Sequence, residues 1–264
     1  MNNVMRKKVG WSLIAVSVLG LLWGLEHEAP YVIDSPGPVT NVLGSSDGTE
    51  IIQLNFSAEE TVGSIDMLTV SGDGIPGDTP TYFEVLAALF SNDQAIFPIE
   101  SDFPEGKNIY DFLAESRRDL KTSIENALAA AQSVLPVGVV ESSEVKIELK
   151  DTGGPSAGLA LALGVVDKLT PGSLTGGKSV AVTGTIDSVG VVGEIGGIRQ
   201  KIFGAKRNGD DFFLVPAGNC RDFFPWHLEL LRVVPVRDLN DALAALKVIS
   251  ADGDIDKLST CSAK

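Results

Sequence analysis

Short runs of apolar residues, broken by glycine, proline and aspartate, dominate the chain after residue 30. Residues 30 to about 75 read as short strands separated by such turn-forming clusters. Apolar residues then recur at helical spacing over 81–90, and residues 119–134 are rich in alanine and leucine. No repeat or low-complexity block marks a linker. We therefore expect residues 30–140 to form one region of strands and helices that packs on the domain after it.

A strand, a glycine turn and a buried helix follow in close succession. In VKIELK, at 145–150, apolar and charged residues alternate, as in a strand with one buried face. Gly153 and Gly154 predict a turn, and Pro155 suits the first turn of a helix because its missing N–H costs no hydrogen bond there. Every residue from 157 to 166 is apolar or glycine. A helix that is apolar on all faces is buried inside a protein.

The segment after this helix contains strands and one further helix. The sequence PGSLTGG ends the buried helix, and a strand is predicted over 180–186. A turn and a second strand follow, then a helix over 198–207 and a strand over 212–216. Elements in this order predict an α+β fold with mixed sheets and flanking helices, in a domain over 141–250.

The first 25 residues differ in character from the rest of the chain. An uncharged and mostly apolar segment covers 9–25, directly after the basic residues 6–8. Its length is near the lower limit for a helix that spans a bilayer. Basic residues before it predict that residues 1–8 lie in the cytoplasm. The sequence therefore predicts a single transmembrane helix in the plasma membrane, with the remaining chain outside the cytoplasm; a cleaved signal peptide is the alternative.

Charge and cysteine content narrow the choice of partners. The formal net charge is -14, whereas nucleic-acid binding needs clustered lysine and arginine, so we expect no nucleic-acid partner. Neither Cys220 nor Cys261 has metal-ligand neighbours in the sequence, and we expect no metal and no other cofactor. Outside the cytoplasm the two cysteines could pair. Because Cys261 lies in a polar stretch, we interpret residues 251–264 as a disordered tail and both cysteines as unpaired or incidental.

The stretch GSLTGGKS, at 172–179, matches the pattern G-x-x-x-x-G-K-[ST] of the loop that holds nucleotide phosphates. Such a loop follows a strand and opens a helix, because the helix N-terminus binds the phosphates. Here the match follows the predicted buried helix and opens a predicted strand. We therefore expect no nucleotide partner.

Ser156 stands between the glycine turn and the buried helix. Backbone N–H groups at a helix start have no intrahelical partner and carry partial positive charge, so they can stabilise an oxyanion. Its small neighbours Gly153, Gly154, Ala157 and Gly158 leave room for a substrate backbone. Ser156 is therefore a candidate nucleophile. The alternative is that it only caps the helix, as serine commonly does.

A serine nucleophile needs a base, and the chain offers histidine and lysine. GPSAG fits the G-x-S-x-G pattern of α/β-hydrolases, but His27 lies at the edge of the N-terminal segment and His227 reads as an ordinary packed or surface histidine. A lysine can act once burial lowers its pKa towards neutrality. On the helix over 198–207, Lys201 and Lys206 lie on opposite margins of the apolar stripe. The pattern favours Lys201 only slightly and does not decide between them.

Three segments in this part of the chain share their order and spacing with a known family. They read GGPSAGLALALGVVDKLTPGSLTGG, VAVTGTIDSVGVVGEIGGIRQKIFGAKRNG and FFLVPAGNC. Together they resemble the proteolytic domain of the Lon serine peptidase family, over most of residues 145–248. They look most like its membrane-anchored, ATP-independent branch, whose members usually carry a PDZ domain. The resemblance implies a serine endopeptidase that acts on protein or peptide substrates.

The resemblance also implies a role for each matching residue. It places the nucleophile on Ser156, the general base on Lys201, and a threonine that hydrogen-bonds the lysine on Thr183. Lys201 would take the proton of Ser156 and return it to the leaving amine, so activity should rise towards alkaline pH. Backbone N–H groups near Ser156 would hold the oxyanion. The residues expected there, or expected to admit the substrate backbone, are Gly153, Gly154 and Ala157.

Two departures from the family pattern limit the resemblance. Cytoplasmic members carry an aspartate at the position of Gly153, and glycine there fits the membrane-anchored branch. Relatives carry the PDZ domain between the helix near Ala131 and the strand at Val145, where this chain has too few residues to form one. Substrate delivery by a PDZ domain is therefore not implied. Because we also see no AAA+ module that could unfold a substrate, we expect unfolded or loosely structured substrates. Lon-type domains commonly form rings, so the resemblance also predicts homo-oligomers. The alternative interpretation is a catalytically silent, membrane-tethered binding or assembly module on the same fold.

Overall fold

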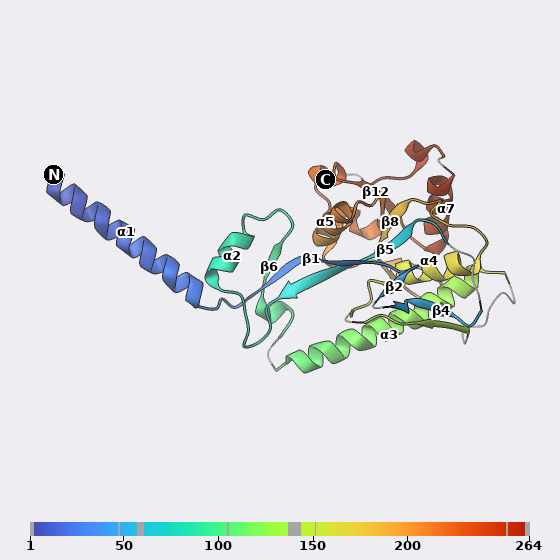
Figure 1. Ribbon diagram of the computed structural model, residues 1–264, viewed down its shortest axis with the longest axis horizontal. Helices are drawn as coiled ribbons and strands as arrows, with labels where there is room; N and C mark the ends of the chain where they lie inside the picture. Colours follow the sequence, from blue (N-terminus) through green and yellow to red (C-terminus); the bar gives the residue numbers. More distant parts are fainter. Residues whose placement is uncertain are drawn as a thin grey trace. The chain divides into compact units, whose positions relative to one another are not determined.

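The computed structural model (Figure 1) describes residues 3–46, 48–56, 61–104, 106–136, 144–150, 152–251 and 253–261. The chain divides into a first unit, Met1–Ser35 with Ser71–Phe112, and a second unit, Pro36–Val70 with Leu113–Lys264. The predicted boundary lay at residue 140 instead. The difference arises because two strands and one long helix each continue from one unit into the other. No linker-like composition marks these crossing points in the sequence.

The first unit consists of helices and short strands. Its elements are α1 (Asn3–Glu26), the start of β1 (Tyr31–Asn41), the end of β5 (Ser64–Asp73), α2 (Tyr82–Ala88), β6 (Ala95–Pro98), the 3₁₀ helix η1 (Ile99–Ser101) and the first residues of α3 (Ile109–Val134). Strand β1 pairs antiparallel with β6, from Tyr31 opposite Pro98 to Asp34 opposite Ala95. Helix α2 begins at a capping box made by Thr81 and Glu84.

Helix α1 covers the segment that the sequence predicts as a membrane anchor. In the part of the chain that the structure describes, however, no helix is long and apolar enough to cross a membrane. The transmembrane helix predicted over 9–25 therefore has no support from the structure.

The second unit is built on a sheet with strands in the order β12–β11–β8–β5–β1. Strand β8 pairs parallel with both β5 and β11, and β11 pairs parallel with β12. The remaining strands of this unit form three two-stranded sheets: β2 with β3, β4 with β7, and β9 with β10. The architecture is α+β with mixed sheets, as predicted.

The bounds of the remaining elements of this unit are as follows. The strands are β2 (Ser45–Ser46), β3 (Thr49–Glu50), β4 (Ile52–Leu54), β7 (Val145–Ile147), β8 (Ser179–Val182), β9 (Thr185–Ile186), β10 (Val192–Gly193), β11 (Phe212–Pro216) and β12 (Arg232–Val236). The helices are α4 (Gly158–Leu169), α5 (Ile198–Asn208), η3 (Ala217–Asp222), α6 (Pro225–Leu228), α7 (Leu239–Ser250) and η4 (Ile255–Lys257).

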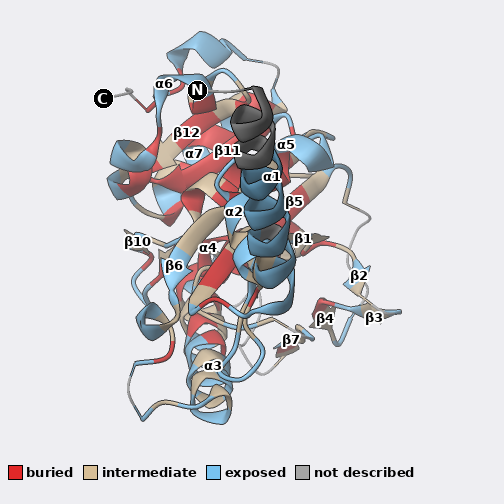
Figure 2. Ribbon diagram, turned by 90° about the vertical axis from the view of Figure 1, so that its left-hand side faces the viewer, coloured by how far each residue is buried: buried red, intermediate tan, exposed pale blue. Residues whose placement is uncertain are grey.

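The two faces of the parallel sheet pack against different helices. Successive side chains of a strand point to opposite faces. Val180 and Val182 of β8 belong to one buried cluster with residues of α3, α4 and α7, whereas Ala181 belongs to a second cluster with residues of α5. Strands β11 and β12 are buried over most of their length (Figure 2). Helices α4 and α5 therefore lie on opposite faces of the sheet, a placement on which the candidate site depends.

Helix α4 is the most deeply buried helix element. All residues from Gly158 to Val166 are buried, as the apolar run predicts, and Asp167 after them is buried too. At Gly158 a Cβ would lie 2.9 Å from the Ser123 hydroxyl and 3.0 Å from the backbone nitrogen of Ile186. Glycine therefore lets the start of α4 pack closely between α3 and β9.

Three element boundaries differ from those predicted. Helix α3 begins ten residues earlier than its alanine-rich part, because the Asn108 side chain accepts the N–H groups of Tyr110 and Asp111 and so caps the helix. Helix α4 begins at Gly158 rather than near Pro155. The strand predicted over 180–186 is split into β8 and β9 at Thr183 and Gly184.

As predicted, GSLTGGKS lies between a helix, α4, and a strand, β8. The predicted absence of a PDZ domain concerns a stretch of which 137–143 lie outside the described residues.

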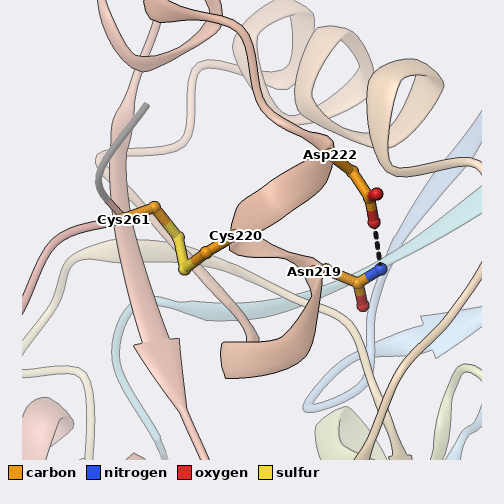
Figure 3. Close-up of a disulfide and its surroundings, with 4 residues drawn as sticks. All are labelled: Asn219, Cys220, Asp222 and Cys261. Atoms are coloured by element: carbon orange, nitrogen blue, oxygen red, sulfur yellow. Dashed lines mark hydrogen bonds between the residues drawn. A yellow bond between two sulfur atoms is a disulfide. The ribbon is translucent and has the colours of Figure 1, made fainter. Parts of the chain in front are cut away.

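Cys220 and Cys261 form a disulfide, which corrects the expectation that they are unpaired (Figure 3). The C-terminal stretch also contains η4, and Leu258 and Cys261 are buried, in contrast to the disordered tail predicted from its polar composition. The bond closes a loop with a sequence separation of 41 residues. For a loop of that length the chain-entropy model gives a stabilisation of about 4 kcal/mol.

A buried pair of carboxyl groups makes the stability of the second unit depend on pH. Asp66 of β5 and Asp210, just after α5, are both buried. Burial, and next the neighbouring Asp66 carboxyl, raise the pKa of Asp210 to about 8. In the unfolded chain its pKa is about 4. Between these values the folded state holds a proton that the unfolded state releases, so the stability falls as the pH rises from about 4 to about 8.

We therefore predict that Asp210→Asn raises the unfolding temperature at pH 9 by several degrees and changes it little at pH 5. Asparagine donates a hydrogen bond to Asp66 at any pH and still accepts the bond from Asn208, so one or two kcal/mol is the expected gain at high pH. Thermal unfolding followed by circular dichroism measures it, with Asp256→Asn at an 89% exposed side chain as the control. An effect of equal size at both pH values would contradict the raised pKa of Asp210.

Candidate active site

Ser156 lies in the turn that precedes helix α4. The helix N-cap is Ala157, and no side chain caps this helix by a hydrogen bond. The interpretation of Ser156 as a simple helix cap is therefore wrong. Its hydroxyl instead contacts a side chain from the opposite face of the sheet, which leaves it available for chemistry.

Helix α3 and the segment after β8 together hold this turn in place. The Gly154 N–H donates to the carbonyl of Ser116 at 2.9 Å, and the Ser123 hydroxyl donates to the carbonyl of Pro155 at 2.9 Å. On the other side the Gly184 N–H donates to the carbonyl of Ser156 at 3.0 Å. Nothing in the spacing of the two α3 serines identified them from the sequence, because serine on a helix is usually a surface residue.

Lys201 reaches Ser156 from helix α5. Its Nζ lies 2.8 Å from the Ser156 Oγ and 3.0 Å from the Thr183 Oγ1, and the residue is only 3% exposed. The helix begins directly after Gly197, whose φ of 68° is a left-handed conformation that favours glycine. Lys206, the alternative base on the same helix, is exposed. The structure thus brings Ser156, Thr183 and Lys201 together.

Thr183 links this pair to the sheet. It follows the carboxyl end of β8 and is fully buried. Its backbone N–H donates to the carbonyl of Leu214 in β11 at 3.1 Å, and its hydroxyl faces the lysine amine. Since α4 and α5 lie on opposite faces, their side chains can meet only beyond the end of a strand. The site therefore lies at the carboxyl end of β8, where ligand sites of parallel sheets commonly occur.

Burial changes the acid–base character of Lys201. Desolvation lowers the pKa of its amine to about 7 from the ordinary value of 10.5. Among the described residues no carboxylate forms an ion pair with it that would favour the charged form. A neutral amine at hydrogen-bond distance from a hydroxyl can accept its proton, so the pair can generate a serine nucleophile near neutral pH.

The three small residues singled out beside Ser156 differ in what they can contribute. The N–H of Gly154 is already bonded to Ser116, so in this conformation it is not a free oxyanion donor. Within the residues that the structure describes, the N–H groups of Ser156 and Ala157 have no hydrogen-bond partner. At Gly153 a Cβ would lie 2.0 Å from the Ser116 hydroxyl, so Ser116 occupies the space of a side chain there.

His227 is not placed to act on Ser156. Its Nδ1 accepts the N–H of Phe224 at 3.1 Å, and its ring packs among Phe203, Phe223 and Trp226. Burial, and next the charge of Arg199, lower its pKa, so it is neutral in the fold. In the described ranges, no group of three or more His, Cys, Asp or Glu side chains could hold a metal ion.

A cavity of about 360 Å³ lies beside the turn that carries Ser156. Its walls come from α3, from Pro155 and from β9 and β10. Asp119, Ser123 and Ile186 are among the lining residues. Because the cavity includes the residue next to the candidate nucleophile, a peptide bound in it would lie close to Ser156.

Comparison with known proteins identifies the family. The model of the Lon protease (S16) C-terminal proteolytic domain matches residues 99–248, more than half of the chain. The chain therefore belongs to this family, which supports a serine peptidase, and the expected resemblance to the Lon proteolytic domain is confirmed.

Individual relatives are longer proteins. Lon protease 2 of Herpetosiphon aurantiacus is 34% identical over 141 residues, covering 50% of this chain and 17% of the relative. Lon protease 1 of Sorangium cellulosum is 32% identical over 173 residues, covering 62% of this chain and 20% of the relative. Lon protease of Neorickettsia sennetsu is 36% identical over 93 residues, 34% of this chain and 11% of the relative. The chain thus matches a fifth or less of each of these proteins.

We predict that Thr183→Val lowers kcat/KM for a peptide substrate by about fivefold and leaves KM nearly unchanged. Valine keeps the branched shape but removes the hydroxyl that accepts a hydrogen bond from the Lys201 amine at 3.0 Å, and one hydrogen bond contributes about 1 kcal/mol. Steady-state kinetics measure the effect. Thr175→Val is the matched control, because Thr175 is also fully buried but its hydroxyl bonds the carbonyl of Val62. Equal activity of wild type and Thr183→Val would contradict a role of this hydroxyl in the reaction.

Proposed function

We propose that this protein is a serine endopeptidase in which Ser156 is the nucleophile and Lys201 the general base. The observation that carries the proposal is the 2.8 Å contact between the Ser156 hydroxyl and a buried lysine amine. Membership of the Lon proteolytic family supports the reaction class, and the lowered pKa of Lys201 supports the role of the base.

The reaction begins when neutral Lys201 accepts the hydroxyl proton of Ser156. The Ser156 oxygen attacks the carbonyl carbon of the scissile peptide bond, and the carbonyl oxygen takes the negative charge. The free N–H groups of Ser156 and Ala157 are the donors proposed for this oxyanion, which they would stabilise most strongly in the transition state. Thr183 orients the amine during the proton transfer.

The intermediate collapses as the carbon–nitrogen bond breaks and Lys201 returns its proton to the leaving amine. The acyl group then remains on Ser156 as an ester. A water molecule gives a proton to Lys201 and attacks the ester carbon. Release of the carboxylic acid product restores the hydroxyl of Ser156, which receives the proton back from Lys201. One lysine thus serves as base and acid in both halves of the cycle.

The substrates proposed are unfolded or loosely structured proteins and peptides, cleaved without nucleotide. The cavity beside Pro155 offers room for an extended peptide segment next to the nucleophile. The phosphate-loop match at 172–179 lies between a helix and a strand, the reverse of the arrangement that binds nucleotide phosphates. Addition of ATP with magnesium to the peptidase assay tests independence, and a rate increase of severalfold would contradict it.

We further propose that the peptidase acts outside the cytoplasm. The disulfide between Cys220 and Cys261 supports this location, because disulfides persist in oxidising compartments and are rare in the cytosol. Membrane attachment through residues 9–25 and self-association stay predictions from the sequence. Thiol trapping in intact cells is the test: free thiols at both positions in the native protein would contradict an oxidising location.

We predict that the chain hydrolyses casein and that Ser156→Ala and Lys201→Ala each reduce the rate at least a thousandfold. Below pH 7 most Lys201 is protonated and cannot accept a proton. The rate should therefore rise about tenfold per pH unit up to about pH 7 and then level off. Release of acid-soluble peptides from pH 5.5 to pH 9 measures it.

Lys206→Ala is the matched control, since it removes an exposed lysine from the same helix and should leave the rate within about twofold. A folded wild type that cleaves no protein or peptide at any pH would contradict the enzyme proposal and favour a silent binding module. Full activity of Lys201→Ala would exclude the lysine as the base.

A further inference from the structure

Helix η3 holds the segment that leads into α5. Asn219 of η3 is only 2% exposed and bonds both backbone groups of Ile195. The Ile195 N–H donates to the Asn219 Oδ1 at 3.0 Å, and the Asn219 Nδ2 donates to the Ile195 carbonyl at 3.0 Å. One amide side chain thus pairs with this residue as a neighbouring β-strand would.

The orientation of the Asn219 amide is set by its neighbours. The Asn219 Nδ2 also donates to the Asp222 carboxylate at 2.7 Å (Figure 3). Arg221 forms an ion pair with Glu194, the residue before Ile195. At Gly218 a Cβ would lie 2.2 Å from the Glu194 Oε1, so η3 and this segment are in direct contact. Gly218, Asn219 and Arg221 of η3 therefore contact residues 194–195, and Asp222 orients the Asn219 amide.

The segment held by Asn219 determines where α5 begins. Gly197, two residues after Ile195, is the N-cap of α5, and its carbonyl accepts the N–H of Lys201 at 3.0 Å. On the other side of η3, Cys220 is joined to Cys261, which belongs to the same buried cluster as Ile198 and Ile202 of α5. The start of the helix that carries the lysine is thus fixed from η3.

We propose that Asn219 is a positioning residue that holds Lys201 at its distance from Ser156. The inference rests on the proposed function and adds a residue that touches neither the substrate nor the reacting atoms. A long side chain on a helix follows any shift of that helix, and an error of about 1 Å in the placement of a catalytic group can cost about a hundredfold in rate. Loss of the bonds from Asn219 should therefore appear in the chemistry of Lys201.

Two substitutions remove these bonds in different ways. Asn219→Leu has similar size and makes none of them. Asn219→Asp still accepts the Ile195 N–H, but it presents an oxygen to the Ile195 carbonyl and to the Asp222 carboxylate. For both variants we expect kcat/KM to fall about 10- to 100-fold. We also expect the midpoint of the pH–rate profile to move up by about one unit, because a displaced amine is better hydrated. The uncharged leucine variant separates displacement from the effect of an added charge.

A rescue variant and a control make the test specific. In Asn219→Asp with Asp222→Asn, the donor and acceptor of the 219–222 bond are exchanged, and we expect part of the rate and of the pH midpoint to recover. Asn240→Asp places the same charge at an exposed position of α7 and should change neither. Unfolding temperatures are measured for every variant. If neither Asn219 variant folds, Asp222→Ala decides. It leaves both bonds between Asn219 and Ile195 in place but removes the carboxylate that orients the Asn219 amide. The pH midpoint should therefore move in the same direction by a smaller amount.

The inference would be overturned if a folded Asn219 variant kept the pH midpoint of the wild type and lost kcat/KM only in proportion to its loss of folded protein. Asn219 would then be a purely structural residue. That outcome is distinct from failure of the proposed function. If the wild type needs Ser156 and Lys201 but not Asn219, only the inference fails. If Lys201→Ala cleaves as well as the wild type, the proposed function fails and the inference with it.

Discussion

The buried amine of Lys201 is the constraint on which the rest of the site depends. Keeping it neutral at pH 7, when the unfolded chain carries it charged, costs on the order of 5 kcal/mol, from the difference between pKa values of about 7 and 10.5. That cost is comparable to the whole stability of an ordinary domain. It is tolerable only because the amine sits at the end of a well-packed parallel sheet, between a fully buried helix on one face and an amphipathic helix on the other.

The same unit contains a second buried titrating group with the opposite pH dependence. The penalty for the neutral Lys201 shrinks as the pH rises from about 7 towards 10.5, whereas the stability that depends on Asp210 falls as the pH rises from about 4 to about 8. The pH dependence of the proposed activity therefore follows Lys201 alone, whereas the pH dependence of the stability follows both Lys201 and Asp210. In the proposed mechanism Lys201 can accept a proton above about pH 7, just below the pH of about 8 at which Asp210 ionises.

Local chemistry could be predicted from the sequence where a short motif carries it. The all-apolar helix, the strand over 212–216, and Ser156, Lys201 and Thr183 as neighbours followed from pattern and family resemblance. The supporting contacts could not be predicted. Ser116, Ser123 and Asn219 are common polar residues whose partners are backbone groups far away in the chain, and no periodicity reveals such bonds. The disulfide between Cys220 and Cys261 was not predicted for a related reason. The polar composition around Cys261 does not indicate that this part of the chain packs against a buried cluster.

In the proposed mechanism the fold itself turns Lys201 into a base, and direct titration of its amine is the test of this role. We would label lysine with ¹⁵N and assign the Lys201 signal by its absence in Lys201→Ala. The amine of Lys206, exposed on the same helix, serves as the internal reference. We predict a Lys201 midpoint of about 7, well below the ordinary lysine value of 10.5. A Lys201 midpoint near 10 in the folded protein would contradict it, since the amine would then be charged at neutral pH and unable to accept a proton from Ser156.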